Sequence, residues 1–173
     1  MWDLIIRDAI HQLASPVLTK LMIAMSIVGA SYITWPLTVV CVVLFYRAGN
    51  IRALGQLALS MPGALALEFT VKQIVRRPRP EPFFGYPLPH SYSFPSGHAL
   101  FAVACFGMLA TLVAPLIPTR IGRALLWTAT ILLVAAIGFS RVYLGVHYPS
   151  DVLGGYAIGL VWVWLAKKLW QRQ

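Results

Sequence analysis

Three short segments of the chain combine cations, histidines and a carboxylate. In order, they contain Lys72 with Arg79-Pro80, then Pro95-Ser96-Gly97-His98, and then Ser140-Arg141 with His147 and Asp151. Fixed cations neutralise charge on phosphoryl oxygens, while imidazole and carboxylate groups supply nucleophiles and proton donors. These residue types are therefore suited to holding a phosphate and breaking its ester or anhydride bond.

The cations of these segments are the first candidates for phosphate binding. Because the planar guanidinium of arginine can bond two oxygens at once, we expect Arg79 and Arg141 to clamp the phosphate. Lys72 adds a third, more compact cation. Arg76 and Arg77 stand beside them, and we interpret these two as side chains that snorkel from a helix end toward water.

The segment Pro95-Ser96-Gly97-His98 is typical of a helix start. Serine can cap the first turn, glycine allows close approach of a ligand, and free N–H groups at a helix N-terminus bind anions. We therefore expect Ser96 and the amide of Gly97 to bind phosphate oxygens. His98 stands in the first turn and can face the same anion.

The ordered patterns K-x6-RP, PSGH and SR-x5-H-x3-D resemble the type 2 phosphatidic acid phosphatase and vanadium haloperoxidase superfamily, in its membrane lipid-phosphatase branch. The resemblance covers roughly residues 53–168. It implies that His98 protonates the leaving oxygen, and that His147 attacks phosphorus to form a phosphohistidine that water hydrolyses. Asp151, four residues after His147, is expected to bond the other ring nitrogen and fix its tautomer. His11 and His90 lack such neighbours, and we interpret them as surface residues.

Glu68 is an unexpected carboxylate inside an apolar run. It stands four residues before Lys72, on the same face of the predicted helix and in the favourable Glu-to-Lys order. Two interpretations stay open: Glu68 supports Lys72 from outside the site, or it makes a polar packing contact. Ser140 is a second candidate for a supporting role.

Metal-dependent chemistry is not expected from these residues. The chain has five acidic residues, and only Asp151 and Glu68 stand near the three segments. A two-metal phosphatase needs a cluster of carboxylates or histidines, and the glycine-rich phosphate loop of nucleotide-binding proteins is absent from the sequence. We therefore predict no metal and no cofactor, with cations and helix amides binding the phosphate.

The composition predicts an integral membrane protein. Of the 173 residues, 59% are hydrophobic and 11% charged, whereas soluble domains have about 25% charged residues. The length suits a single domain over residues 1–173, with the patterns spanning 72–151. The net charge of +9 does not indicate nucleic-acid binding, because most lysine and arginine residues of the chain belong to short loops, the tail and the pattern segments. The expected partners are a lipid phosphate or diphosphate and membrane lipids; no feature indicates an oligomeric state.

Apolar runs predict an all-α, polytopic membrane helical bundle. A spanning helix needs about 20 apolar residues. Runs at about 53–74, 98–117, 122–142 and 152–169 predict four spans, and about 31–46 predicts a fifth. The preceding residues, about 16–29, predict an interfacial or re-entrant N-terminal helix, because Gly29 and Pro36 interrupt the run.

Basic loops predict the orientation. Seven cations of the short loops and the tail fall on one side of the alternating spans: Arg47, Arg52, Arg120, Arg123, Lys167, Lys168 and Arg172. Cytoplasmic loops are enriched in lysine and arginine. With the resemblance to small bacterial members, this predicts a multi-pass protein of the bacterial cytoplasmic membrane, with a cytoplasmic C-terminus and the phosphate site facing the periplasm or outside.

The loop at residues 80–95 is rich in proline and aromatic residues. Two interpretations stay open for its phenylalanines, Phe83 and Phe84. They anchor the loop at the membrane–water boundary, where aromatic rings are enriched, or they form a lid that helps admit a lipid headgroup.

The resemblance makes undecaprenyl diphosphate the first choice of substrate. Phosphatidylglycerol phosphate, phosphatidate and lipid A phosphate are alternatives, because the three patterns address only the phosphate. A phosphotransferase with a lipid acceptor is a related activity. Vanadate-dependent haloperoxidation disagrees with the apolar spans, and a non-enzymatic lipid carrier or scramblase needs neither His147 nor His98.

Overall fold

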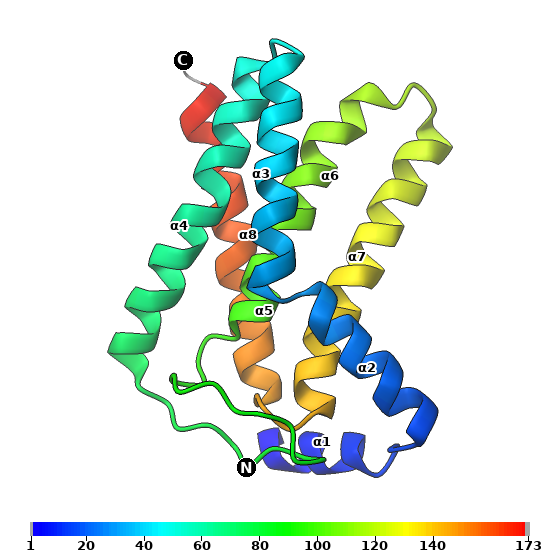
Figure 1. Ribbon diagram of the computed structural model, residues 1–173, viewed down its shortest axis with the longest axis vertical. Helices are drawn as coiled ribbons and strands as arrows, with labels where there is room; N and C mark the ends of the chain where they lie inside the picture. Colours follow the sequence, from blue (N-terminus) through cyan, green and yellow to red (C-terminus); the bar gives the residue numbers. More distant parts are fainter. Residues whose placement is uncertain (1, 172–173) are drawn as a thin grey trace.

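The protein is an all-helical bundle in the computed structural model, which describes residues 2–171 (Figure 1). The elements are α1 (Trp2–His11), α2 (Pro16–Val28), α3 (Ser31–Arg47), α4 (Ile51–Val75), α5 (Gly97–Ala102), the π-helical turn η1 (Val103–Gly107), α6 (Met108–Val113), the 3-10 turn η2 (Ala114–Leu116), α7 (Arg120–Tyr143) and α8 (Pro149–Gln171). Within residues 2–171 no strand occurs, so the predicted all-α class is confirmed.

Four helical segments are long and apolar enough to cross a membrane. They cover Ile51–Val75, Gly97–Leu116, Arg120–Tyr143 and Pro149–Trp170, in agreement with four predicted spans. A fifth span exists only if α2 and α3, which meet at a bend of 46°, count as one broken span. The structure therefore does not confirm α3 as an independent fifth span. Its 17 residues are fewer than the roughly 20 that a spanning helix needs.

The connections between the helices lie at two opposite ends of the bundle. The α3–α4 turn, the α6–α7 turn and the end of α8 lie at one end, whereas α1 and the long loop after α4 lie at the other (Figure 1). The basic residues of those turns and of α8 therefore share one end, as the sequence predicts. Arg172, also assigned to this group, lies outside the described residues. The compartment that each end faces stays a prediction.

Glycines let α8 approach the helix that begins at Gly97. A Cβ atom on Gly155 would lie 2.7 Å from the carbonyl oxygen of Ser96 and 2.9 Å from Cβ of Ala99. One on Gly159 would lie 2.9 Å from Cβ of Val103. Small residues four apart allow such close packing of membrane helices. The first turn of α8 is thereby held against the start of α5.

Ser60 of α4 is bonded both to the π-helical turn η1 and to α8. The hydroxyl of Ser60 on α4 donates to the carbonyl oxygen of Ala104 at 2.6 Å. The indole Nε1 of Trp162 on α8 donates to the carbonyl oxygen of Ser60 at 2.8 Å. Because no water satisfies polar groups in an apolar core, these bonds fix the depth of α4 and α8 relative to η1.

The short helix α1 lies across the site end of the bundle and was not predicted from the sequence (Figure 1). Asp3 and Arg7, four residues apart, are buried on one face. The opposite side is apolar and exposed, with Ile5 at 65% and Trp2 at 50% of full exposure. This pattern is typical of an amphipathic helix at a membrane surface.

The glycine contact can be tested with Gly155→Ala. Because the added methyl group meets backbone atoms that cannot rotate away, we expect it to lower the free energy of unfolding by about 1–3 kcal/mol. Thermal unfolding in detergent measures this change. Gly107→Ala is the matched control, since its Cβ would meet only Val103 Cγ1 at 3.6 Å. Equal stability of the two variants would contradict the close α5–α8 contact.

Candidate active site

A cavity of about 510 Å³ opens at the end of the bundle that carries the long loop. Its lining includes most of the predicted site residues: Lys72, Arg79, Gly97, His98, Arg141 and His147, together with Glu68. These side chains come from α4, α5, α7 and the two loops after α4 and α7. The structure therefore brings all three sequence patterns to one cavity.

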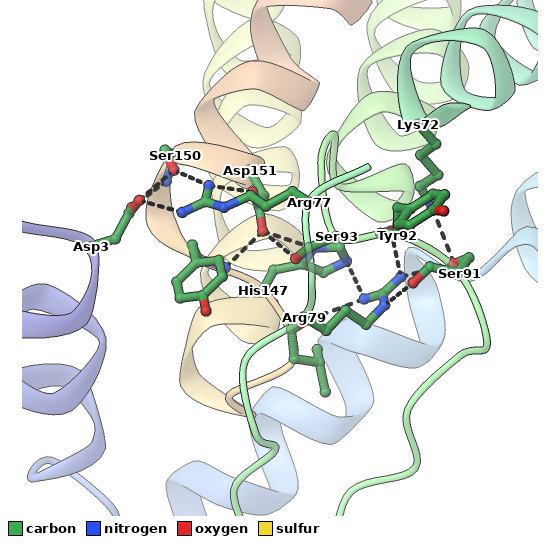
Figure 2. A network of polar contacts seen from close by, with 12 residues as sticks. Asp3, Lys72, Arg77, Arg79, Ser91, Tyr92, Ser93, His147, Ser150 and Asp151 are labelled. Atoms are coloured by element: carbon green, nitrogen blue, oxygen red, sulfur yellow. Dashed lines mark hydrogen bonds and ion pairs between the residues drawn. The ribbon is translucent and has the colours of Figure 1, made fainter. Parts of the chain in front are cut away.

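The orientation of Arg79 is set by hydrogen bonds to two loops, the one after α4, to which it belongs, and the one after α7. The helix α4 ends at Val75, and its C-cap residue Arg76 has a left-handed φ of 49°. Arg79 Nε donates to the carbonyl oxygen of Ser91 at 2.7 Å, and its NH2 group donates to the hydroxyl of Ser91 at 3.0 Å. Its NH1 group also donates to the carbonyl oxygen of Val146 at 3.0 Å (Figure 2). The guanidinium therefore faces the cavity in a fixed orientation.

The contact between Arg79 and His147 determines the tautomer of the imidazole. Arg79 NH1 lies 3.0 Å from Nε2 of His147. A guanidinium can only donate hydrogen bonds, so Nε2 must be the acceptor. The proton of the neutral ring then resides on Nδ1, which lies 3.4 Å from Oδ2 of Asp151. The lone pair of Nε2 is consequently directed at NH1 of Arg79, whose side chain lines the cavity.

Burial keeps this imidazole neutral. It is the largest cause that lowers the pKa of His147 from 6.5 to about 4. The hydrogen bond to Asp151 opposes this effect, and the cations of Arg79 and Arg141 add to it. The pKa of Arg79 is also lowered, to about 10, by burial and by Arg141, which leaves the guanidinium charged at neutral pH.

Asp151 is fully buried and accepts hydrogen bonds from several segments. The amide of Tyr148 donates to Oδ2 at 2.9 Å, and the hydroxyl of Ser93 donates to the same oxygen. Arg77 NH1 donates to Oδ1 at 2.7 Å. The interpretation of Arg77 as a snorkelling side chain is therefore wrong, because its guanidinium turns inward to the buried carboxylate. Arg76 is exposed, as predicted.

Arg141 has a guanidinium that retains free donor capacity. It is 2% exposed, its NH1 group donates to the hydroxyl of Ser26, and its guanidinium carbon lies 5.6 Å from the ring centre of Tyr86. Its buried Nε has no hydrogen-bond partner in the part of the chain that the structure describes. An anion in the cavity would satisfy this donor.

Glu68 lies at the edge of the anion-binding groups. Its Oε1 is 2.7 Å from Nζ of Lys72, which confirms the predicted ion pair. The same oxygen would lie 2.3 Å from a Cβ atom on Gly97. The lack of a side chain at Gly97 is therefore what allows the carboxylate to rest over the start of α5. Its role in the reaction stays a proposal.

The two serines of the patterns lie away from the cavity. Ser96 is fully buried, and its hydroxyl makes no cap bond to α5 and has no partner among the described residues. Ser96 therefore does not cap α5 with its side chain, and its amide donates to the carbonyl oxygen of Asp151 at 3.0 Å. The phosphate contact expected of Ser96 stays a prediction. Ser140 bonds back to the carbonyl oxygen of Ile137 at 2.6 Å. Neither serine lines the cavity.

Further residues of the site were missed by sequence reasoning. Ser93 bridges Asp151 and the Nδ1 side of His147, and Asp3 pairs with Arg77. Tyr32 and Trp35, from the start of α3, line the cavity. A usable signal existed for Asp3, because a chain with five acidic residues offers few partners for an inward-facing arginine.

The aromatic loop packs on α1 rather than projecting from the protein. Phe83 stacks on His11 with ring centres 3.7 Å apart, and Arg7 covers the Phe83 ring at 4.0 Å. The amide of Phe83 donates to the carbonyl oxygen of Leu144 at 3.0 Å. The surface assignment of His11 is therefore wrong, whereas His90 is exposed as predicted. Phe84 remains 48% exposed.

The chemistry available to the site is anion binding by cations next to a neutral imidazole. Lys72, Arg79 and Arg141 supply positive charge, and Glu68 supplies the one carboxylate among the cavity-lining residues. Within residues 2–171 no group of three or more His, Cys, Asp or Glu residues could hold a metal ion. A phosphoryl group fits these partners by charge and hydrogen-bonding geometry.

The chain is similar to known membrane phosphatases. It is 33% identical over 171 residues to phosphatidylglycerophosphatase B of Bacillus subtilis, covering 95% of this chain and 81% of that protein. It is 31% identical to an undecaprenyl-diphosphatase of Sulfolobus acidocaldarius, covering 82% of this chain and 66% of that protein.

A solved structure agrees with this similarity. The crystal structure of a transmembrane PAP2 type phosphatidylglycerolphosphate phosphatase from Bacillus subtilis superposes with a TM-score of 0.85 at 29% identity. The superposition covers 98% of this chain and 85% of that one. The family model of the PAP2 superfamily matches residues 53–173. The chain therefore belongs to the PAP2 superfamily, as a membrane lipid phosphatase.

Proposed function

We propose that this chain hydrolyses a lipid phosphate or diphosphate through a phosphohistidine at Nε2 of His147. The observation that carries the proposal is the contact of Arg79 with Nε2, at 3.0 Å, which leaves the proton on Nδ1 beside Asp151. The neutral imidazole can attack phosphorus once NH1 of Arg79 bonds an oxygen of the bound phosphate in place of Nε2, because this exchange frees the lone pair.

The reaction proceeds in two displacements. The lone pair of Nε2 attacks phosphorus, the bond from phosphorus to the leaving oxygen breaks, and His98 transfers a proton to that oxygen. Water then attacks phosphorus, the bond from phosphorus to Nε2 of His147 breaks, His98 takes up the proton of the water, and inorganic phosphate leaves. Lys72, Arg79 and Arg141 stabilise the charge on the equatorial oxygens, and Asp151 stabilises the charged ring of His147.

The cavity walls support a lipid as the carrier of the phosphate. Tyr32 and Trp35 of α3, Leu65 of α4 and Phe101 of α5 line the same cavity as the cations. An anionic head in contact with cations and a tail leaving between apolar and aromatic side chains would satisfy both parts of a lipid phosphate. Residues of the long loop after α4 line the cavity, and this loop lies at the end of the bundle opposite the basic turns (Figure 1). By the charge bias of those turns we place the site at the outer face of the bacterial cytoplasmic membrane.

Undecaprenyl diphosphate is the first choice of substrate, supported by the relative from Sulfolobus acidocaldarius that carries this activity in its name. Phosphatidylglycerophosphate is the second candidate, supported by the 33% identity to the Bacillus subtilis enzyme. Both substrates offer a terminal phosphate to the same cations, so the tail and the group beyond the phosphate decide between them.

The nucleophile is tested with His147→Ala in purified, detergent-solubilised protein. We expect phosphate release to fall by at least about a thousand-fold, because the covalent intermediate can no longer form. Phosphate release is measured over undecaprenyl diphosphate, phosphatidylglycerophosphate, phosphatidate and lipid A, with a strong chelator present. His90→Ala, at an exposed position, is the control and should keep full activity.

The same assay separates the other candidate functions. A phosphorylated acceptor lipid in place of free phosphate would indicate a phosphotransferase. Release that survives in His147→Ala would contradict the phosphohistidine. Turnover of no lipid by the wild type, with or without an acceptor, would favour a lipid carrier or scramblase.

The role of Glu68 is tested with Glu68→Gln. Loss of the ion pair frees Lys72, and we expect kcat/KM to fall by about ten-fold, as is typical when a group that orients a functional side chain is removed. Steady-state kinetics on the preferred lipid provide the measurement. Glu81→Gln, the same change at an exposed loop position, should leave kcat/KM unchanged. Equal kinetics of Glu68→Gln and wild type would favour a polar packing contact.

The lowered pKa of His147 predicts the acid limb of the pH profile. The ring must be neutral to attack, and burial lowers its pKa to about 4, so activity is retained at pH 5–6 and lost as the pH falls through about 4. The profile of kcat/KM measures this limb after correction for the substrate phosphate, whose second pKa is about 6. A limb that remains near 6.5 after this correction would contradict a neutral, buried imidazole.

A further inference from the structure

Asp3, at the start of α1, is bonded directly to the support of the active site. Its Oδ2 accepts from NH2 of Arg77 at 2.8 Å and from the hydroxyl of Ser150 at 2.6 Å. Its Oδ1 accepts from the amide of Ser150 at 2.9 Å. One carboxylate thus joins α1 to the loop after α4 and to the first turn of α8.

Arg77 continues this chain of contacts to the reacting groups. Its NH1 group donates to Oδ1 of Asp151 at 2.7 Å and to the hydroxyl of Ser150 at 2.6 Å. The other oxygen of Asp151 lies 3.4 Å from Nδ1 of His147. Figure 2 shows the continuous path from Asp3 through Arg77 and Asp151 to His147.

The charges of the outer pair support this path. Burial alone would raise the pKa of Asp3, but hydrogen bonds from Ser150 and Arg77 outweigh burial and lower it below the ordinary value. Burial acts against the charge of Arg77 as well, but its two carboxylate partners raise its pKa. Asp3 and Arg77 are therefore both charged at neutral pH.

The electrostatics give Asp3 a function beyond holding α1 in place. An arginine paired only with Asp151 would neutralise the carboxylate that stabilises the charged ring of His147. Because Asp3 shares the guanidinium, more of the charge on Asp151 remains available to His147. The carboxylate of Asp3 also bonds the N-terminal turn of α8, where the helix dipole favours a negative charge. That turn carries Asp151.

We propose that Asp3 is a positioning residue for the reaction, acting through Arg77 and Ser150 to hold Asp151 in its orientation and charge state toward His147. This inference rests on the proposed phosphohistidine mechanism. It makes α1, which lies outside the three sequence patterns, a working part of the active site. Asp3 contacts neither the cavity nor the substrate, so its effect is expected on the chemical step.

Asp3→Asn tests the proposal, because the amide keeps the size of the side chain and removes its charge. We expect kcat to fall by about ten-fold, with KM for the preferred lipid changed less than about two-fold. Asp3→Glu should recover part of the lost kcat, since it restores the carboxylate. Asp8→Asn is the matched control on the same helix. Its side chain is 61% exposed, and its one polar contact within residues 2–171 is with Arg7, at 3.4 Å, so kinetics should be unchanged.

A double-mutant cycle decides whether Asp3 acts through Arg77. We expect Asp3→Asn to cost less than about two-fold in kcat when Arg77→Gln is already present, because contacting residues are not additive. Independent, multiplied losses would overturn the path. So would wild-type kcat in Asp3→Asn, or a rise in KM with kcat unchanged.

A failure of the proposed role of Asp3 can be distinguished from a failure of the proposed phosphohistidine mechanism. If wild type releases phosphate, His147→Ala does not, and Asp3→Asn equals wild type, only the role of Asp3 fails. Thermal unfolding of each variant in detergent, with kcat expressed per folded protein, separates a kinetic effect from a loss of fold. An Asp3→Asn variant with wild-type stability and a lowered kcat supports the proposal. If Asp3→Asn does not fold, an Asp3→Glu variant with wild-type stability and a lowered kcat supports it instead. Asp3→Glu with wild-type kcat beside an unfolded Asp3→Asn would overturn it, because the carboxylate would then serve the fold alone.

Discussion

The burial of one carboxylate, Asp151, governs the architecture of the site end. A buried charge is costly unless it is paired and fully hydrogen-bonded. Asp151 obtains its partners from two loops: the loop after α4 supplies Arg77 and Ser93, and the loop after α7 supplies the amide of Tyr148 and the ring of His147. The two loops can satisfy this carboxylate only by folding against α8. The same contacts place His147 and Arg79 next to each other.

On the cavity side, positive charge is in excess. Lys72, Arg79 and Arg141 converge there, and Glu68 is the single carboxylate that lines the cavity. Like charges at such a site repel, and the unpaired Nε of Arg141 adds a buried donor without an acceptor among the described residues. A phosphate satisfies both requirements at once. Substrate affinity and the cost of assembling the cations are therefore two aspects of one electrostatic arrangement.

Close packing between the helices fixes the positions from which these loops extend. Gly155 allows α8 to contact the start of α5, so the helix that carries Asp151 and the helix that carries His98 share one interface. Ser60 and Trp162 bond across the apolar interior, where no water competes. The helix α1 closes the same end from outside the bundle and reaches the buried charges through Asp3.

The sequence by itself determined the parts of the site and the apolar helices. Four spans were readable because a membrane core imposes about 20 apolar residues on each crossing. The residue types of the three patterns suit phosphate chemistry and the patterns resemble a known family, so six candidate residues could be named, and they meet in one cavity: Lys72, Arg79, Gly97, His98, Arg141 and His147. The Glu68–Lys72 pair followed from helix periodicity, since residues four apart share a face.

Only the tertiary structure decided which polar groups pair with one another over long distances in the chain. Arg77 looked like a snorkelling cation, but its partners Asp3 and Asp151 each lie 74 positions away. Ser96 was expected to bind a phosphate oxygen, but its hydroxyl is buried outside the cavity lining without a partner among the described residues, and only its amide bonds to Asp151. Spacing along a chain predicts contacts within one helix. Pairing between helices depends on burial and approach, which are properties of the folded protein.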